Sequence, residues 1–324
     1  MQMRLGMMAT AVALVVALSN PAHALWTWTR ETGRWINTEK LPRETPQLQV
    51  EYARSLLLSG QHKRAYRETE KFEEFYGDSD YADQNQFLRG EIRLAQGNRL
   101  DAAREFQKVI ANYPDSDLYE QVIEKQYDIA DAYYESGLKS IERPWWRLFR
   151  KRPLRRSIEV YSMVIDNQPF TDAAAEAQYK VGLCHHTLKE YEESAFEYRR
   201  VIEDYSASDW VDEAGHGLAT SYYMSALPPD YDQTPSQLAI DAVDDFKARF
   251  PGDARQAELD TQRLEMRERI ASQRLKTAQF YEKRRRFVAA RQYYEVVVNQ
   301  FPETEAARKA QEKLDAASGE GSSS

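Results

Sequence analysis

Cysteine is almost absent from this sequence. Cys184 is the only one among 324 residues, so no disulfide can form within the chain. Glycine and proline are also scarce, at 13 and 12 residues, and long stretches contain neither. Sheet proteins need these residues at their frequent turns, so the scarcity favours a fold built of helices. The hydrophobic content of 42% provides for a sizeable core and excludes a disordered chain.

A basic overall charge and the familiar catalytic motifs are missing as well. The formal net charge of −8 argues against binding of nucleic acid. No Ser-His-Asp arrangement, phosphate-binding glycine loop or metal-binding helix motif is present. Cys184, His185 and His186 are consecutive, so on a helix their side chains point roughly 100° apart and cannot share one metal ion. We therefore predict a protein that is not an enzyme and has no cofactor or metal.

The first 24 residues contain the longest apolar run. Arg4 precedes the run Leu5–Leu18, and Ala22-His23-Ala24 follows it. A charged start, a short apolar stretch and a small-residue site are typical of a cleaved secretory signal peptide. We predict that residues 1–24 are this signal, with an uncleaved membrane anchor as the alternative. No cysteine lies near the site, so the sequence predicts export to the periplasm without an N-terminal lipid.

One phrase of four residues recurs along the chain: a small residue, an aromatic or apolar residue four later, an apolar residue three after that, and a turn. Spacings of four and three place the first three members on one helical face. Proline then ends the helix, and a Ser or Thr two residues later caps the next one. The clearest copies are Ala102, Phe106, Val109 and Pro114; Ser157, Tyr161, Val164 and Pro169; Ser194, Tyr198, Val201 and Ser206; Ala239, Val243, Phe246 and Pro251; and Ala290, Tyr294, Val297 and Pro302.

A second helical stretch precedes each phrase, so each unit is expected to be a pair of helices. Gly60, Gly97 and Gly137 stand where such first helices would end. Gly90 and Gly182 each lie twelve residues before the small residue of the phrase, where a missing side chain lets two helices approach. Recurring helix pairs predict an all-α, tetratricopeptide-like (TPR-like) solenoid of about six units.

The solenoid is predicted to cover residues 47–314, with an insertion at 139–153. Residues 25–46 are predicted to be a Trp-rich extension, which caps the first unit or serves as a partner-binding arm or surface anchor. Residues 315–324 end in serines and predict a disordered tail.

The insertion leads into a basic and aromatic segment in an otherwise acidic protein. Tryptophan beside arginine and lysine is typical of contacts at a membrane interface. We therefore predict contact with an anionic membrane or an acidic partner; packing on the chain's own acidic surface and binding of nucleic acid are the alternatives. The candidate residues are Arg143, Trp145, Trp146, Arg147, Phe149, Arg150, Lys151, Arg152, Arg155 and Arg156.

The helix pairs and their turns resemble the BamD family, also called ComL or YfiO. Tyr113-Pro114-Asp115-Ser116, followed by Ala130-Asp131-Ala132-Tyr133-Tyr134-Glu135-Ser136-Gly137, carries the resemblance best. It implies a periplasmic TPR component of the machinery that assembles outer-membrane β-barrels, located at the outer membrane. The implied partners are a β-barrel insertase, bound by the C-terminal units, and client proteins, bound by the N-terminal units. The family's lipid-bearing cysteine has no counterpart here. An adaptor for peptidoglycan machinery, like the Tol–Pal-associated TPR proteins, and a secretion scaffold are the alternatives.

Overall fold

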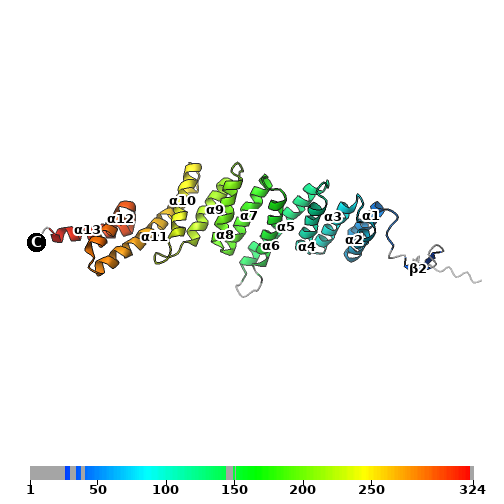
Figure 1. The fold of residues 1–324 in the computed structure, drawn as a ribbon, viewed down its shortest axis with the longest axis horizontal. Coiled ribbons are helices and arrows are strands. Elements are labelled where there is room, and N and C mark those ends of the chain that lie inside the picture. Colours follow the sequence, from blue (N-terminus) through cyan, green and yellow to red (C-terminus); the bar gives the residue numbers. More distant parts are fainter. Residues whose placement is uncertain (1–25, 30–33, 38–40, 144–148, 150, 322–324) are drawn as a thin grey trace, which may run out of the picture. The chain divides into compact units, whose positions relative to one another are not determined.

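The computed structural model describes residues 26–29, 34–37, 41–143, 149 and 151–321. Within these ranges the chain forms thirteen helices preceded by one two-stranded hairpin (Figure 1). The strands are β1 (Trp26–Thr29) and β2 (Arg34–Asn37). The helices are α1 (Pro46–Leu58), α2 (His62–Tyr76), α3 (Ala82–Ala95), α4 (Arg99–Asn112), α5 (Tyr119–Ile141), α6 (Arg152–Asn167), α7 (Asp172–Leu188), α8 (Tyr191–Asp204), α9 (Val211–Ser225), α10 (Thr234–Arg249), α11 (Gln256–Lys283), α12 (Phe287–Gln300) and α13 (Glu305–Gly321).

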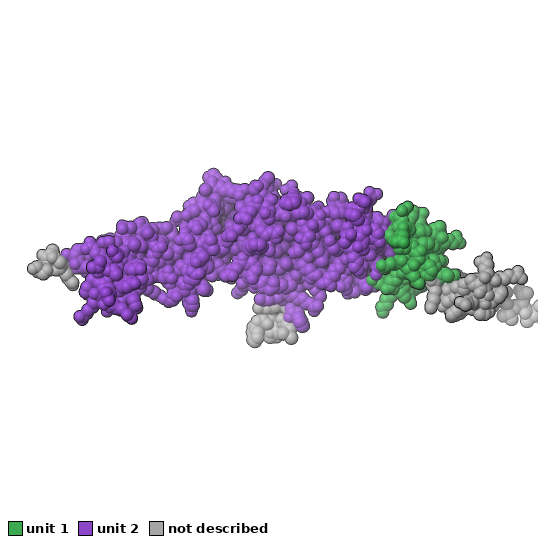
Figure 2. Space-filling view, in the orientation of Figure 1, with its two compact units in different colours: residues 1–82 green, residues 83–324 purple. Residues whose placement is uncertain are grey.

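The chain divides into two compact units, residues 1–82 and 83–324 (Figure 2). In the first unit α1 packs on α2, and Phe72 is fully buried. The side-chain amide of Gln49 donates to the backbone carbonyl and to the carboxylate of Glu68, at 2.9 Å each. β1 and β2 pair antiparallel, with Trp28 opposite Trp35. These strands in the Trp-rich extension were not predicted from the sequence.

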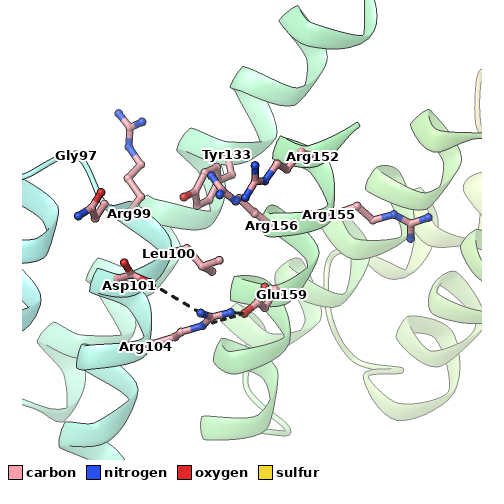
Figure 3. Close-up of a pocket in the computed structure, with 11 residues that line it drawn as sticks. Gly97, Arg99, Leu100, Asp101, Arg104, Tyr133, Arg152, Arg155, Arg156 and Glu159 are labelled. Carbon is pink, nitrogen blue, oxygen red and sulfur yellow. Dashed lines mark hydrogen bonds and ion pairs between the residues drawn. The ribbon is translucent and has the colours of Figure 1, made fainter. Parts of the chain in front are cut away.

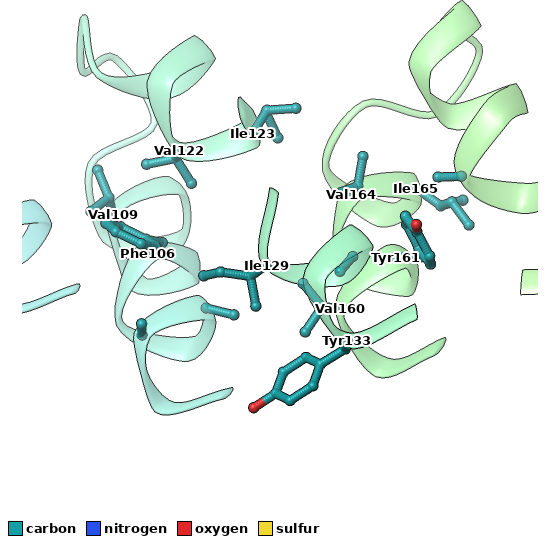
Figure 4. Close-up of a cluster of buried hydrophobic side chains, with 14 of the residues drawn as sticks. Phe106, Val109, Val122, Ile123, Ile129, Tyr133, Val160, Tyr161, Val164 and Ile165 are labelled. Carbon is teal, nitrogen blue, oxygen red and sulfur yellow. The ribbon is translucent and has the colours of Figure 1, made fainter. Parts of the chain in front are cut away.

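The second unit is an all-α solenoid in which each helix from α4 onward packs on the next one along the chain. Helices two apart, such as α4 and α6 or α9 and α11, also touch, so neighbouring pairs share one continuous core. Figure 4 shows the centre of this core, where Ile129 of α5 lies between Phe106 of α4 and Tyr161 of α6. The TPR-like fold predicted from the repeat is confirmed.

The recurring phrase forms the core of every second helix. Its small, aromatic and apolar members are buried in all the copies quoted above, from Ala102 to Val297. A Cβ atom at Gly90 would lie 2.4 Å from the ring of Phe106, and one at Gly182 would lie 2.7 Å from that of Tyr198. Each of these glycines therefore lets the aromatic residue of its own pair approach the first helix directly.

Gly60 and Gly97 end their helices in the left-handed conformation, with φ of 74° and 80°. The same prediction for Gly137 was wrong, because α5 continues past it to Ile141. A Cβ atom at Gly137 would lie 2.4 Å from Cδ2 of Leu154 on α6. This glycine therefore provides for close packing of α5 and α6 and does not end a helix.

Two predicted boundaries also need correction. The insertion predicted at 139–153 shrinks to 142–151, because α5 extends into it and Arg152 and Pro153 already belong to α6. The predicted tail at 315–324 is helical as far as Gly321. The cause is burial: Ala306, Ala307 and Ala310 pack into the last core cluster, and the helix that they begin runs on.

None of the helices in the described ranges combines the length and the apolar character that crossing a bilayer requires.

Candidate functional site

A pocket of about 500 Å³ opens between α4, α5 and α6 (Figure 3). Arginines from two helices dominate its wall, and we call it the arginine pocket. It is lined by Gly97, Asn98, Arg99, Leu100, Asp101, Arg104, Tyr133, Arg152, Arg155, Arg156 and Glu159.

The ends of two helices place these arginines. Gly97 turns the chain in the left-handed conformation and starts α4 at Arg99. On the other side, α6 starts at Arg152 with proline in its first turn, which suits a helix N-terminus. Arg152, Arg155 and Arg156 are spaced three and four apart, so they lie on one side of α6. Tyr133 of α5 lies between the two helix ends (Figure 3).

Two of the five arginines are neutralised. Arg104 donates to Glu159 at 2.7 Å and lies 3.9 Å from Asp101, and the hydrogen bond to Glu159 is the main cause that raises the pKa of Arg104. Arg155 points away from the other arginines and pairs with Glu190 (Figure 3).

The other three arginines have no carboxylate partner among the described residues. The Arg156 guanidinium lies 5.5 Å from the centre of the Tyr133 ring, and that of Arg152 lies 5.8 Å from the centre of the Phe149 ring. Arg99 is exposed at the start of α4. The arginine pocket thus holds three uncompensated positive charges in a protein whose formal net charge is −8.

The ten predicted contact residues therefore fall into three groups. Arg152, Arg155 and Arg156 line the arginine pocket. Arg143, Phe149 and Lys151 are exposed beside it, and Phe149 retains 72% of its full exposure. The remaining four lie outside the described residues: Trp145, Trp146, Arg147 and Arg150. Sequence reasoning missed Arg99 and Tyr133, because only the packing of α4, α5 and α6 brings them to the basic segment.

A second basic and apolar surface was overlooked at the turn between α11 and α12. Arg284, Arg285 and Arg286 form this turn, and the Arg284 guanidinium lies 4.6 Å from the centre of the Phe280 ring. Phe287 and Val288 follow with 64% and 78% of their surface exposed. The sequence does contain a signal for this surface, because four consecutive basic residues, 283–286, stand directly before Phe287 and Val288.

An apolar groove of about 450 Å³ lies between α8, α9 and α10. Its floor includes Leu218 and Tyr222, which are one helical turn apart on α9, and Leu238 of α10. Such a surface suits an apolar segment of a partner protein.

Cys184 and the neighbouring histidines do not form a site. The Cys184 side chain is fully buried beside Leu154 and Leu188, and burial raises the pKa of its thiol to about 12. Burial also lowers the pKa of His186. Across the described part of the chain, no three His, Cys, Asp or Glu side chains come together in a way that could hold a metal ion.

Comparison with known proteins adds family evidence. The family model for YfiO, described as an outer membrane lipoprotein, matches residues 153–318, and a tetratricopeptide repeat model matches residues 84–116. No protein of curated function matches the sequence.

The solved structures that resemble this chain do so distantly. A thermophilic TPR protein from Thermus thermophilus is 13% identical over 68% of this chain and 98% of its own, with a TM-score of 0.32. A tetratricopeptide repeat protein from Parabacteroides merdae is 12% identical over 82% and 96%, with a TM-score of 0.31. PilF of Pseudomonas aeruginosa is 11% identical over 83% and 97%, with a TM-score of 0.30. Values this low carry no argument about function.

Proposed function

The chain belongs to the YfiO family of outer membrane lipoproteins, and from this premise we propose that it is a periplasmic scaffold that binds protein partners during assembly of β-barrel proteins into the outer membrane. It supplies binding surfaces rather than chemistry. The partners we propose are a β-barrel insertase and its unfolded clients.

The observation that carries this proposal is the family match over residues 153–318. The matched segment runs from α6 to α13, which is half of the chain and most of the second unit. TPR-like units expose helical surfaces that suit extended or helical segments of other proteins. We assign the insertase to the C-terminal pairs, where the apolar groove between α8 and α10 lies, and clients to the N-terminal pairs.

The proposed location also calls for contact with the membrane. Cys184, the only cysteine of the given sequence, is buried within α7. We propose that the exposed cations and aromatic side chains near Arg143–Arg156 and at the turn between α11 and α12 take this role. Aromatic residues beside cations suit the interface of an anionic membrane.

Site-specific crosslinking tests the scaffold role. A photo-crosslinking amino acid in place of Leu238 lies in the apolar groove, and one in place of the exposed neighbour Gln237 on the same helix serves as the matched control. We expect the probe at 238 to capture a β-barrel insertase from envelope membranes, with far less captured at 237. Depletion of the protein should lower the levels of outer-membrane β-barrel proteins. Capture of peptidoglycan factors with unchanged β-barrel levels would contradict the proposal.

A further inference from the structure

We propose that the arginine pocket binds the phosphate group of an anionic lipid headgroup. The inference deepens the proposed function, on which it rests for the membrane itself. It assigns the contact to a defined pocket rather than to diffuse charge along the basic segment.

The charge balance of the pocket calls for an anion. Arg99, Arg152 and Arg156 line the pocket without a carboxylate partner among the described residues, whereas Asp101 and Glu159 are already engaged by Arg104. Three guanidinium groups within one pocket repel one another. A bound anion removes that repulsion. In the described part of the pocket, the fold itself supplies no free carboxylate that could do so.

The geometry favours phosphate. Guanidinium groups bind phosphate oxygens through paired N–H donors, and guanidiniums reaching in from two helices suit a group with several oxygens. The N-terminus of α4 adds backbone N–H groups, because Asn98 before it makes no side-chain capping hydrogen bond. The start of α6 adds little, because the Arg152 N–H donates to the Phe149 carbonyl and Pro153 has no N–H. A carboxylate has only two oxygens and would leave part of this donor set unused.

The size of the pocket points to more than a bare ion. Its volume of about 500 Å³ lies within the range of roughly 300–1,000 Å³ that small-molecule sites occupy. A phosphate that carries a glycerol or sugar headgroup would therefore fit.

The surroundings indicate a lipid rather than a soluble phosphate. Phe149, with 72% of its surface exposed, lies against Arg152 at the edge of the pocket. In Figure 1 the turn between α11 and α12 lies at the lower edge of the second unit, and the end of α5 and the start of α6 lie farther along the same edge. That turn presents Arg284 and Arg285 together with the exposed Phe287. Two basic and aromatic surfaces on one edge suit a planar anionic membrane.

The test compares three double variants of the purified chain that lose the same amount of charge. Arg152→Gln with Arg156→Gln alters the pocket; Arg284→Gln with Arg285→Gln alters the other basic turn; and Arg54→Gln with Lys63→Gln removes exposed cations of the first unit. Each is measured by co-sedimentation with phosphatidylglycerol vesicles and by calorimetric titration with glycerol 3-phosphate. Circular dichroism checks folding, and the single variant Arg99→Gln, at an exposed position on α4, replaces the pocket variant if that variant unfolds.

We expect the pocket variant to bind the vesicles about thirtyfold more weakly, since each cation at an anionic surface contributes on the order of 1 kcal/mol. We expect Arg99→Gln to bind about fivefold more weakly and the first-unit variant to change less than about threefold. Glycerol 3-phosphate binding should be lost in the pocket variant and kept in the other two double variants. Equal vesicle binding by the pocket and first-unit variants would overturn the proposal.

Binding of glycerol 3-phosphate in the pocket with vesicle binding unaffected by the pocket variant would instead identify a soluble phosphate ligand and also overturn it. Neither measurement depends on an insertase, so failure of the scaffold role and failure of the lipid site are distinguishable.

Discussion

At the residue scale, glycines set how closely the two helices of a pair approach. Gly90 and Gly182 occupy the same position in their units and face the buried rings of Phe106 and Tyr198. The aromatic residue thus packs on bare backbone. A methyl group added at either glycine would clash with the facing ring.

We predict that Gly90→Ala lowers the free energy of unfolding by up to about 2 kcal/mol. Alanine gains about 1 kcal/mol in helix propensity, but overpacking a core costs roughly 1–3 kcal/mol, and three ring atoms of Phe106 would lie within 3.0 Å of the new Cβ atom. Urea unfolding measures the change. Adding Phe106→Leu should make the glycine substitution nearly neutral, as a double-mutant cycle will reveal. A stabilised Gly90→Ala protein would contradict the close packing.

A buried glutamine reaches a glutamate nineteen residues later in several pairs. Gln86 donates to Glu105 at 2.8 Å, and Gln178 donates to Glu197 in the same arrangement. Burial alone would raise the pKa of Glu105, but hydrogen bonds from Gln86 and Lys108 and the charge of Arg89 hold it below its ordinary value. Burial dominates at Glu197 and raises its pKa. This repeated contact was not predicted, although the spacing of nineteen residues between the glutamine and the glutamate is visible in the sequence.

The two glutamates should therefore respond oppositely to neutralisation. Ionised Glu105 stabilises the fold above its ordinary pKa of 4.5 and loses this contribution as the pH falls, whereas ionisation of Glu197 opposes folding once the pH rises through that value. At neutral pH we expect Glu105→Gln to lower the free energy of unfolding by about 1–2 kcal/mol and Glu197→Gln to raise it by less than about 1 kcal/mol. Urea unfolding at neutral and acidic pH should show both differences shrinking in acid. Changes of the same sign would refute this account.

At the element scale, helices whose core faces repeat the phrase were predictable, and helix ends that depend on distant contacts were not. Ala102, Phe106 and Val109 mark a buried face by spacing alone. In the local sequence Gly137 resembles a glycine that ends a helix. The residue whose close packing requires a glycine there is Leu154, which lies beyond the insertion, so the local sequence does not reveal this contact. For the same reason the basic residues of α6 could be identified from the sequence, whereas the opposite wall of the arginine pocket could not.

The last helix offers a test of predicted capping. Thr304 follows Pro302 by two residues, and its hydroxyl accepts a hydrogen bond from the backbone N–H of Ala307 at 3.1 Å. We expect Thr304→Ala to destabilise α13 by about 1 kcal/mol, and Thr304→Ser to leave it nearly unchanged. Hydrogen exchange of the α13 amides measures this. Equal protection in both variants would show that Glu268, which accepts from the N–H of Glu305 at 2.7 Å, caps the helix alone.

At the scale of the whole molecule, positive charge is concentrated in two turns of the second unit. These turns within helix pairs, 142–151 and 284–286, hold more Arg and Lys than Asp and Glu, whereas a third turn of the same kind, 226–233, holds Asp230 and Asp232 and no basic residue. Turns between pairs such as 113–118 and 301–304 hold acidic residues and no basic ones. Because consecutive helices pack with alternating direction, the two kinds of turn lie at opposite edges. The charges are visible in the sequence, but that the two basic turns share an edge follows only once each turn is assigned to an edge.

The shared edge of the two basic turns predicts which edge meets a membrane. Phe287 follows the basic turn between α11 and α12, and Phe170, 84% exposed, lies in the turn between α6 and α7 at the opposite edge. Each can be changed to cysteine and labelled with a polarity-sensitive fluorophore, because the native Cys184 is buried and its thiol pKa is raised to about 12. With phosphatidylglycerol vesicles, we expect the label at 287 to shift to the blue and brighten, and the label at 170 to keep its spectrum in water. Salt should reverse the shift, because the attraction is electrostatic. A larger shift at 170 than at 287 would place the acidic edge against the membrane and refute the assignment.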